Sequence, residues 1–278
     1  MKVLYITDLH GVESKYNQVL EIALSSRVDL IINGGDMLPT RPNFFIQDTF
    51  IEEFLNPYFN TINSHDIYYL FIPGNDDLKI HDDLLKNVAD RYPKILYLQE
   101  RLHKINDFEF IGMNWVTDLP FGLKDRARMD TEDFLFPRQI GKPVFSTKDG
   151  FEVIEDWFSY AKTLPTLQEE LEKLVKPINM KNTVYVLHMP PSDVSLDVCS
   201  DARRVGSKAI YEFIKKHQPL LTLHGHIHES PQMTNKWHNT IGKTISIQPG
   251  QSNHYEKYLA YVLIDLETLA MERKVFHQ

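Results

Sequence analysis

The sequence of 278 residues has a single cysteine, Cys199, and no long hydrophobic run. One cysteine cannot form a disulfide within the chain, and this scarcity suits a reducing compartment, so we expect a cytoplasmic protein. No apolar run approaches the roughly 20 residues that a membrane-spanning helix needs. The short apolar stretch at the start of the chain ends at Asp8, too early for a signal peptide. The sequence therefore predicts no membrane partner.

Positive charge is also scarce. The 30 lysines and arginines are outnumbered by 38 acidic residues, which gives a formal net charge of −8, and no long basic run occurs. This balance argues against non-specific binding to nucleic acid. The composition is otherwise that of a globular protein, with 42% hydrophobic and 24% charged residues. We expect one domain over residues 1–278, in an oligomeric state that the composition leaves open.

Histidines, in contrast, are concentrated in one place, at His224, His226 and His228. The apolar run 219–223 before them predicts a short buried strand, and Gly225 permits a sharp turn at its end. Side chains two apart in an extended segment share a face, so His226 and His228 are expected to point into one cavity. His224 would lie beside them or be buried behind them. Neutral imidazole is the commonest metal ligand among side chains, so this stretch favours a metal site.

Four more apolar segments end in polar side chains. The segments cover residues 3–7, 30–32, 67–72 and 183–187. The polar side chains that follow them are Asp8 and His10, then Asp36, then Asn75, Asp76 and Asp77, and finally His188. Helical spacing over 15–25 and 45–62 separates the first three strands, so the pattern predicts an α/β fold with a largely parallel sheet. Ligands of such sheets collect beyond the carboxyl ends of the strands.

These loops also allow simpler interpretations. Asp8 and His10 could form an ordinary side-chain-stabilised turn. Asp76 and Asp77 could be solvated acids, although two adjacent carboxylates behind a glycine turn are costly unless a cation is present. Ser207 could cap a helix over 207–217, or the N-terminus of that helix could hold an anion.

Residues 114–150 form a long stretch without clear periodicity that is rich in aromatic residues and arginines. Loops of this length in a compact domain are usually functional or disordered, and the aromatic content argues against disorder. One or two helices are expected over 151–175, broken near Pro165. We interpret about 114–180 as a cap-like insert beside the site; the alternative is a peripheral packing layer.

Five blocks occur in a fixed order, each after an expected strand. They are Asp8-Leu9-His10, Gly35-Asp36, Gly74-Asn75-Asp76-Asp77, His188 and Gly225-His226-Ile227-His228. This order resembles the calcineurin-like metallophosphoesterase superfamily over nearly the whole chain, with the insert as its least matched part. The resemblance implies a four-layer α/β/β/α sandwich with two mixed central sheets.

The resemblance also implies two metal ions whose ligand sets share one carboxylate. One set would be Asp8, His10, Asp36 and His228. The other would be Asp36, Asn75, His188 and His226. A bridging carboxylate can hold two divalent ions about 3.5–4 Å apart, so that a shared hydroxide attacks phosphorus in line. Mixed nitrogen and oxygen ligands suit manganese, iron or zinc without choosing among them.

The sequence departs from the family pattern at one place. Most members have a histidine after the asparagine, thought to assist the transition state or to protonate the leaving group, where this chain has Asp76. The departure puts the acid step in doubt, and His254, His81 and His224 are possible substitutes.

The sequence thus predicts a dinuclear metal-dependent phosphohydrolase that favours phosphodiesters over monoesters. The substrate would be a phosphate-ester small molecule or a nucleotide, with Asn75 and Asp76 acting in catalysis. Expected substrate contacts are Arg126, Arg128, Arg203, Ser207 and His254. The alternative is a non-catalytic or weakly catalytic protein-binding scaffold on the same fold, which the Asp76 departure favours mildly and the complete ligand set opposes.

Overall fold

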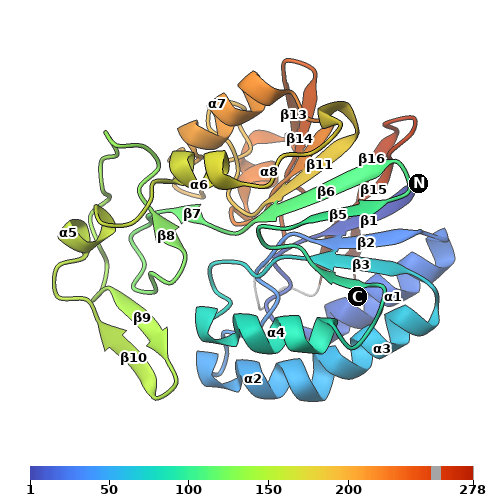
Figure 1. Cartoon of the computed structure of the whole chain (residues 1–278), viewed down its shortest axis with the longest axis horizontal. Helices are drawn as coiled ribbons and strands as arrows, with labels where there is room; N and C mark the ends of the chain where they lie inside the picture. The colour runs from blue at the N-terminus through green and yellow to red at the C-terminus, as the bar shows by residue number, and fades with distance from the viewer. Residues whose placement is uncertain (252–257, 278) are drawn as a thin grey trace.

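The computed structural model describes residues 1–251 and 258–277, and two six-stranded sheets packed face to face form its centre (Figure 1). The first sheet has the order β16-β15-β1-β2-β3-β4. Strands β1 to β4 are parallel, β15 pairs antiparallel with β1, and β16 pairs antiparallel with β15. Its strands are β1 (Lys2–Ile6), β2 (Leu30–Asn33), β3 (Tyr68–Phe71), β4 (Ile95–Tyr97), β15 (Tyr258–Asp265) and β16 (Met271–His277).

The second sheet has the order β13-β14-β12-β11-β6-β5. Its four central strands run parallel, and an antiparallel strand closes each edge. Its strands are β5 (Leu102–Ile105), β6 (Phe108–Met113), β11 (Thr183–Leu187), β12 (Leu221–Leu223), β13 (His238–Ile241) and β14 (Thr244–Ile247). Both sheets are therefore mixed, and the expected architecture of two mixed sheets is confirmed.

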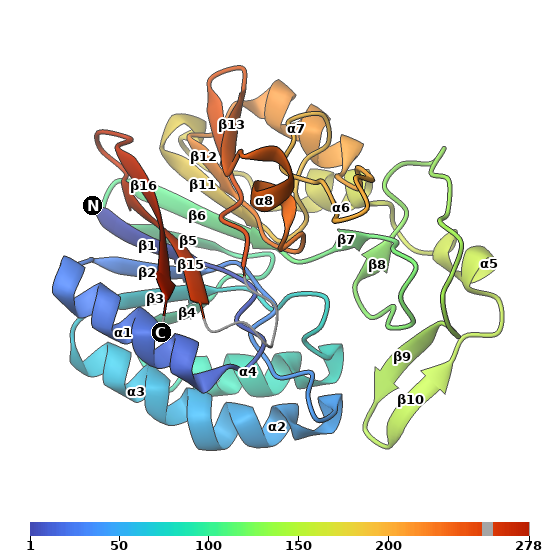
Figure 2. The ribbon, with the colours of Figure 1, turned by 180° about the vertical axis from the view of Figure 1, so that it is seen from behind.

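Helices cover the outer face of each sheet (Figures 1 and 2). Those on the first sheet are α1 (Glu13–Ser26), α2 (Gln47–Phe50), α3 (Asn56–Ser64) and α4 (Asp82–Ala89), and those on the second are α6 (Leu167–Lys173) and α7 (Lys208–His217). A short α8 (Ser230–Thr234) follows the histidine stretch. Separate apolar clusters fill the space under each helical layer and between the sheets, which gives the four layers. No helix of the described residues is long and apolar enough to cross a membrane.

The helix expected over 45–62 is present as a succession of short helical segments. A 3-10 turn, η1 (Phe44–Ile46), leads into α2, a π-helical segment, η2 (Ile51–Leu55), and α3. Pro57 follows the π-helical segment η2, in which the N–H of Asn56 reaches back five residues to Ile51, and the helical backbone continues through Asn56 into α3. Two further 3-10 turns, η3 (Lys79–His81) and η4 (Met180–Asn182), precede α4 and β11.

The insert extends to one side of the sandwich (Figures 1 and 2). It contains β7 (Val116–Thr117), β8 (Ala127–Arg128), β9 (Val144–Thr147), β10 (Gly150–Val153) and α5 (Trp157–Ala161). Ala127, Met129, Trp157 and Ala161 form a small apolar cluster of its own. The expectation of helix from residue 151 was wrong, because β10 pairs with β9 there and the helix begins only at Trp157.

Candidate metal centre

The ligands predicted from the sequence come from the ends of five strands in both sheets. Asp8 and His10 follow β1, Asp36 follows β2, and Asn75 follows β3. His188 follows β11 and His226 and His228 follow β12, in the opposite sheet. Because the two sheets pack face to face, these loops meet at one end of the sandwich. The structure thus brings all seven predicted ligands together.

Four of the ligand residues have a backbone conformation that residues other than glycine rarely adopt. Their φ angles are positive, at 56° for Asp8, 46° for His10, 49° for Asp36 and 71° for His226. Such conformations cost on the order of 1–3 kcal/mol each and persist where the surrounding structure enforces them, often at functional sites. The loops are therefore held in a shape that the sequence alone would not favour.

Two groups of ligand atoms share the carboxylate of Asp36. One ligand atom from each of Asp8, His10, Asp36 and His228 can be chosen so that all lie within 4.8 Å of one another, and the same holds for Asp36, His188 and His226. The Nε2 atoms of His10 and His228 are 3.1 Å apart. Asn75 joins the second group, since its Oδ1 lies 3.0 Å from Nε2 of His188. The shared carboxylate places the two groups side by side.

The ring of His188 is fixed from behind. Its Nδ1 is 2.8 Å from the carbonyl oxygen of Gly34, so this nitrogen donates a hydrogen bond and leaves Nε2 facing the cluster. Gly35 makes room for the ring, because a Cβ at this position would lie 2.5 Å from Nδ1 and φ is +115°. A glycine is therefore required here for the histidine to reach the cluster.

The charges of the cluster favour bound cations. Burial alone would raise the pKa of Asp8 and Asp36, but the imidazoles of His228 and His188 outweigh it and lower both. Burial and the carboxylates of Asp36 and Asp77 raise the pKa of Asp76 to about 8. Divalent ions relieve crowding of carboxylates of this kind because they supply the missing positive charge.

His226 tests whether metal fits the site. Its Nε2 is buried and has no hydrogen-bond partner among the described residues. Burial, with the positive charge of His188 second, lowers the pKa of His226 to about 3, so the ring is neutral and has a free lone pair. A buried polar atom without a partner costs about 1–3 kcal/mol, and coordination would satisfy it. The nitrogen and oxygen donors present thus fit two divalent ions, with no sulfur ligand to favour zinc.

A cavity of about 820 Å³ opens over this cluster. His10, Asp36, Asn75, His226 and His228 line its floor together with Asp76. The insert contributes one wall through residues 117–123, 134, 135 and 137, and the loop at 203–206 contributes another. The insert therefore borders the cavity over the cluster.

Comparison with known proteins agrees with this geometry. The family model for calcineurin-like phosphoesterases matches residues 1–230. The chain belongs to the calcineurin-like phosphoesterase family. Membership supports metal-dependent hydrolysis of phosphoesters and a site for two divalent ions, which the buried aspartate and histidine cluster matches.

Solved structures share the fold of this phosphoesterase at low sequence identity. One is 20% identical with a TM-score of 0.64, over 99% of this chain and 98% of the other. TT1561 of Thermus thermophilus is 15% identical with a TM-score of 0.57, over 98% and 97%. A dimetal phosphatase from Danio rerio is 12% identical with a TM-score of 0.50, over 100% and 98%. A search of curated proteins gives no significant match.

The two adjacent acids of the phosphoesterase have different surroundings. Asp77 is fully buried and accepts hydrogen bonds from the backbone N–H groups of Met37, Leu38 and Gly74, so it holds two ligand loops together. Asp76 lines the cavity with a side chain that is 34% exposed, and one of its oxygens lies 3.7 Å from Nδ1 of His10. The structural role of Asp77 was not predicted from the sequence.

Two of the arginines that we expected to contact substrate lie outside the cavity lining. Arg126 is buried, pairs with Asp82, and donates to the carbonyl oxygens of Gly74 and Asp77. Arg128 lies against the ring of Trp115, at 3.8 Å, and pairs with Glu170. Neither residue lines the cavity, because both guanidinium groups satisfy charges and carbonyls inside the protein. The expectation that they reach substrate needs this correction.

Of the other expected contacts that the structure describes, Arg203 lines the cavity and Ser207 does not, and the unpredicted Arg204 lies beside Arg203. Ser207 is buried, donates to Asp130 and caps α7, so the simpler interpretation of Ser207 applies. His254 lies outside the described residues.

Neither of the other two possible proton donors reaches the cavity. The two ring nitrogens of His224 contact backbone carbonyls of Leu187 and Met189 and the hydroxyl of Thr222. Its ring is buried in the second sheet, which lowers its pKa to about 4. His81 does not line the cavity. Neither replaces the histidine that most family members have at the position of Asp76.

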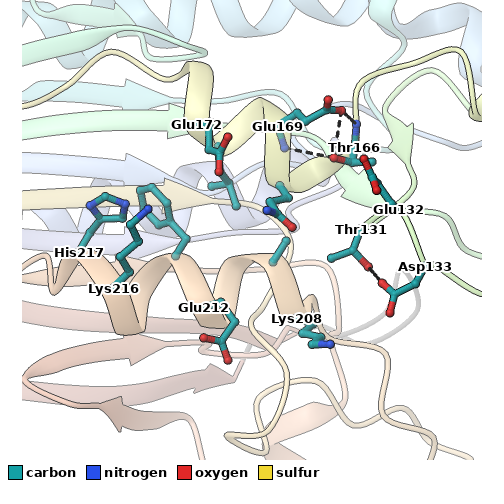
Figure 3. A pocket seen from close by; sticks show the side chains of 14 residues that line it. Thr131, Glu132, Asp133, Thr166, Glu169, Glu172, Lys208, Glu212, Lys216 and His217 are labelled. Atoms are coloured by element: carbon teal, nitrogen blue, oxygen red, sulfur yellow. Dashed lines mark hydrogen bonds between the residues drawn. The ribbon is translucent and has the colours of Figure 1, made fainter.

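A second hollow, which we call the helix hollow, lies between α6 and α7 (Figure 3). Its volume is about 700 Å³, and it is lined by polar residues such as Glu169, Glu212, Lys208 and His217. It contains none of the seven ligands of the metal centre. The family's chemistry therefore belongs to the first cavity.

Proposed function

We propose that this protein is a dinuclear metal-dependent phosphodiesterase. The observation that supports it most directly is the pair of ligand groups that share Asp36 at the floor of an open cavity. Asp8, His10, Asp36 and His228 would hold one ion, and Asp36, Asn75, His188 and His226 the other. When bound, two such ions supply a Lewis acid and a hydroxide nucleophile at neutral pH. Manganese is our first candidate, and a cytoplasmic location remains our expectation.

Asp76 has a positioning role in this proposal. The amide nitrogen of Asn75 lies 3.0 Å from Oδ1 of Asp76, while its oxygen faces His188. The carboxylate thus accepts from the amide and keeps the oxygen of Asn75 turned toward the ligand cluster. The backbone N–H of Asp76 in turn donates to Oδ1 of Asp36, at 2.8 Å.

The pKa of Asp76, about 8 in the protein without metal, would fall once two cations bind beside it, and the ionised carboxylate supports the preference for diesters. A phosphate monoester carries close to two negative charges at neutral pH, and a diester carries one. A carboxylate on the cavity floor therefore repels a monoester more strongly. The described part of the cavity also offers no histidine in the position of the usual proton donor, so diesters with a good leaving group are favoured. Arg203, on the facing wall, is the candidate contact for a free phosphate oxygen.

The proposal is tested with protein purified without chelator. We expect elemental analysis to find about two divalent ions per chain, and bis(p-nitrophenyl) phosphate to be hydrolysed faster than p-nitrophenyl phosphate in the presence of Mn²⁺. The Asp36→Asn variant should bind neither metal ion, because both groups of ligands share this carboxylate. Protein without metal after incubation with Mn²⁺, or with metal but without turnover, would favour the scaffold alternative.

A further inference from the structure

Most side chains that the insert contributes to the cavity are apolar, in contrast to the ionic floor, and its polar ones are Thr117, Asp118 and Asp130. The apolar side chains, which we call the apolar wall, are Leu119, Pro120, Phe121, Leu123, Phe134, Leu135 and Pro137. Phe121 is 62% exposed and Leu135 is 89% exposed. Large apolar side chains left in solvent next to one another often mark a place where a ligand binds.

The cavity is also larger than the reacting group requires. Its volume of about 820 Å³ lies in the range of pockets that enclose whole drug-sized ligands, roughly 300–1,000 Å³. A phosphate on the floor leaves most of this space to its ester groups. None of the seven side chains of the apolar wall carries a hydrogen-bonding group, so they recognise a neighbouring ester group only through apolar contact.

From this arrangement we infer the class of substrate, an inference that rests on the proposed phosphodiesterase function. We propose that the protein selects phosphodiesters whose retained ester group, the one not released in the reaction, is large and apolar, and that Phe121, Phe134 and Leu135 bind this group. An aromatic ring and an alkyl chain share the required chemistry. The insert would then act in specificity through its apolar side chains, whereas its arginines Arg126 and Arg128 do not line the cavity.

A series of diesters with one leaving group tests the inference. Methyl, phenyl and octyl p-nitrophenyl phosphate all carry one negative charge and all release p-nitrophenolate. Each enzymatic rate is divided by the rate of uncatalysed hydrolysis of the same diester, so that the comparison reports how the retained group is bound. We expect kcat/KM to be at least about tenfold higher for the phenyl or octyl diester than for the methyl diester. The ratio between phenyl and octyl then distinguishes an aromatic from an alkyl substrate.

Matched substitutions locate the effect on the wall. Leu135→Ala removes an apolar side chain that is 89% exposed, and Ile178→Ala removes one that is 91% exposed and does not line the cavity. Both variants should fold, because neither side chain is buried. Leu135→Ala, and more strongly Phe121→Ala, should lower the preference for the large diester several-fold, mainly through KM, while Ile178→Ala leaves it unchanged. Equal ratios in all variants would overturn the inference.

A binding measurement separates this inference from the proposed function. Diphenyl phosphate and dimethyl phosphate have poor leaving groups, so their affinities are measured by calorimetry without appreciable turnover. Tighter binding of diphenyl phosphate that Leu135→Ala weakens supports the apolar wall even if no diester is hydrolysed, in which case only the proposed function fails. Turnover of diesters with no preference for apolar groups, in rate or in binding, overturns the inference and leaves the proposed function standing.

Discussion

The cavity over the metal centre and the helix hollow are similar in size but differ in how their polar groups are used. In the cavity, ligands from both sheets converge, four of them have positive φ angles, and Nε2 of His226 is buried without a hydrogen-bond partner among the described residues. In the helix hollow, two pairs of polar side chains bond close neighbours in sequence. Thr166 and Glu169 form a capping box at the start of α6, and Thr131 bonds Asp133.

The difference teaches that volume alone does not identify a site. A polar group that has found a local partner is part of the stability of its helix. A polar group that is brought to the same point as others from distant segments, at a cost in backbone strain, indicates a ligand. Single substitutions in or near each region test this difference.

The largest effect is expected from a ligand of the metal centre. Removing groups that only orient metal ligands commonly costs 10–100-fold in affinity or activity, so His226→Ala should cost more than about a hundredfold in phosphodiesterase activity and lower the metal content. His217→Ala, in the helix hollow, is the matched histidine control and should retain both. Elemental analysis and kcat/KM measure the two effects. Equal behaviour of the two variants would remove the distinction between the regions.

Arg126→Ala should have the second largest effect, on stability. The substitution leaves carbonyl oxygens of Gly74 and Asp77 and the carboxylate of Asp82 without their buried partner, so we expect a loss of about 3 kcal/mol in the free energy of unfolding. Urea denaturation measures this loss. Arg126→Lys should recover only part of it because lysine lacks the planar fork. Arg138→Ala, at an exposed position of the insert, should change stability by less than about 0.5 kcal/mol.

Asp76→His is expected to change selectivity. Removing one negative charge a few ångströms from the phosphate should raise the monoesterase to diesterase ratio on the order of tenfold. The ratio is measured at saturating Mn²⁺, because the substitution also removes the carboxylate that orients Asn75 and should weaken metal binding. Asp83→His, at an exposed acid outside the cavity lining, is the control and should leave the ratio as it is. A wild-type protein that already prefers monoesters, or an unaltered ratio in Asp76→His, would show that this carboxylate does not set the preference.

The smallest effect is expected in the helix hollow. Thr166→Ala removes the helix cap and should cost about 1 kcal/mol of stability, measured by denaturation, with kcat/KM unchanged. Thr166→Ser keeps the hydroxyl and should restore most of the stability. Loss of activity in a Thr166→Ala variant that is fully folded under the assay conditions would mean that the helix hollow takes part in function.

The sequence predicted the sheet strands and the family well because both depend on patterns that are local in the sequence. Apolar segments of three to six residues followed by polar loops indicate strands in a parallel sheet, and the order of Asp8, Asp36, His188 and His226 indicates the family. The insert was predicted less well. The hairpin of β9 and β10 was missed, although Asp149-Gly150 is a common turn pair and Gly150 has φ +138°.

The amino-acid sequence by itself determined the α/β class, the family and which side chains are available as metal ligands. Only the tertiary structure decided which arginines line the cavity. Arg126 and Arg203 are both arginines in loops, but one is enclosed by Asp82 and the carbonyls of a ligand loop and the other lines the cavity. The physical reason is that a guanidinium group binds whichever acceptors the fold brings near it. Those acceptors belong to segments far away in the sequence, so no local pattern announces them.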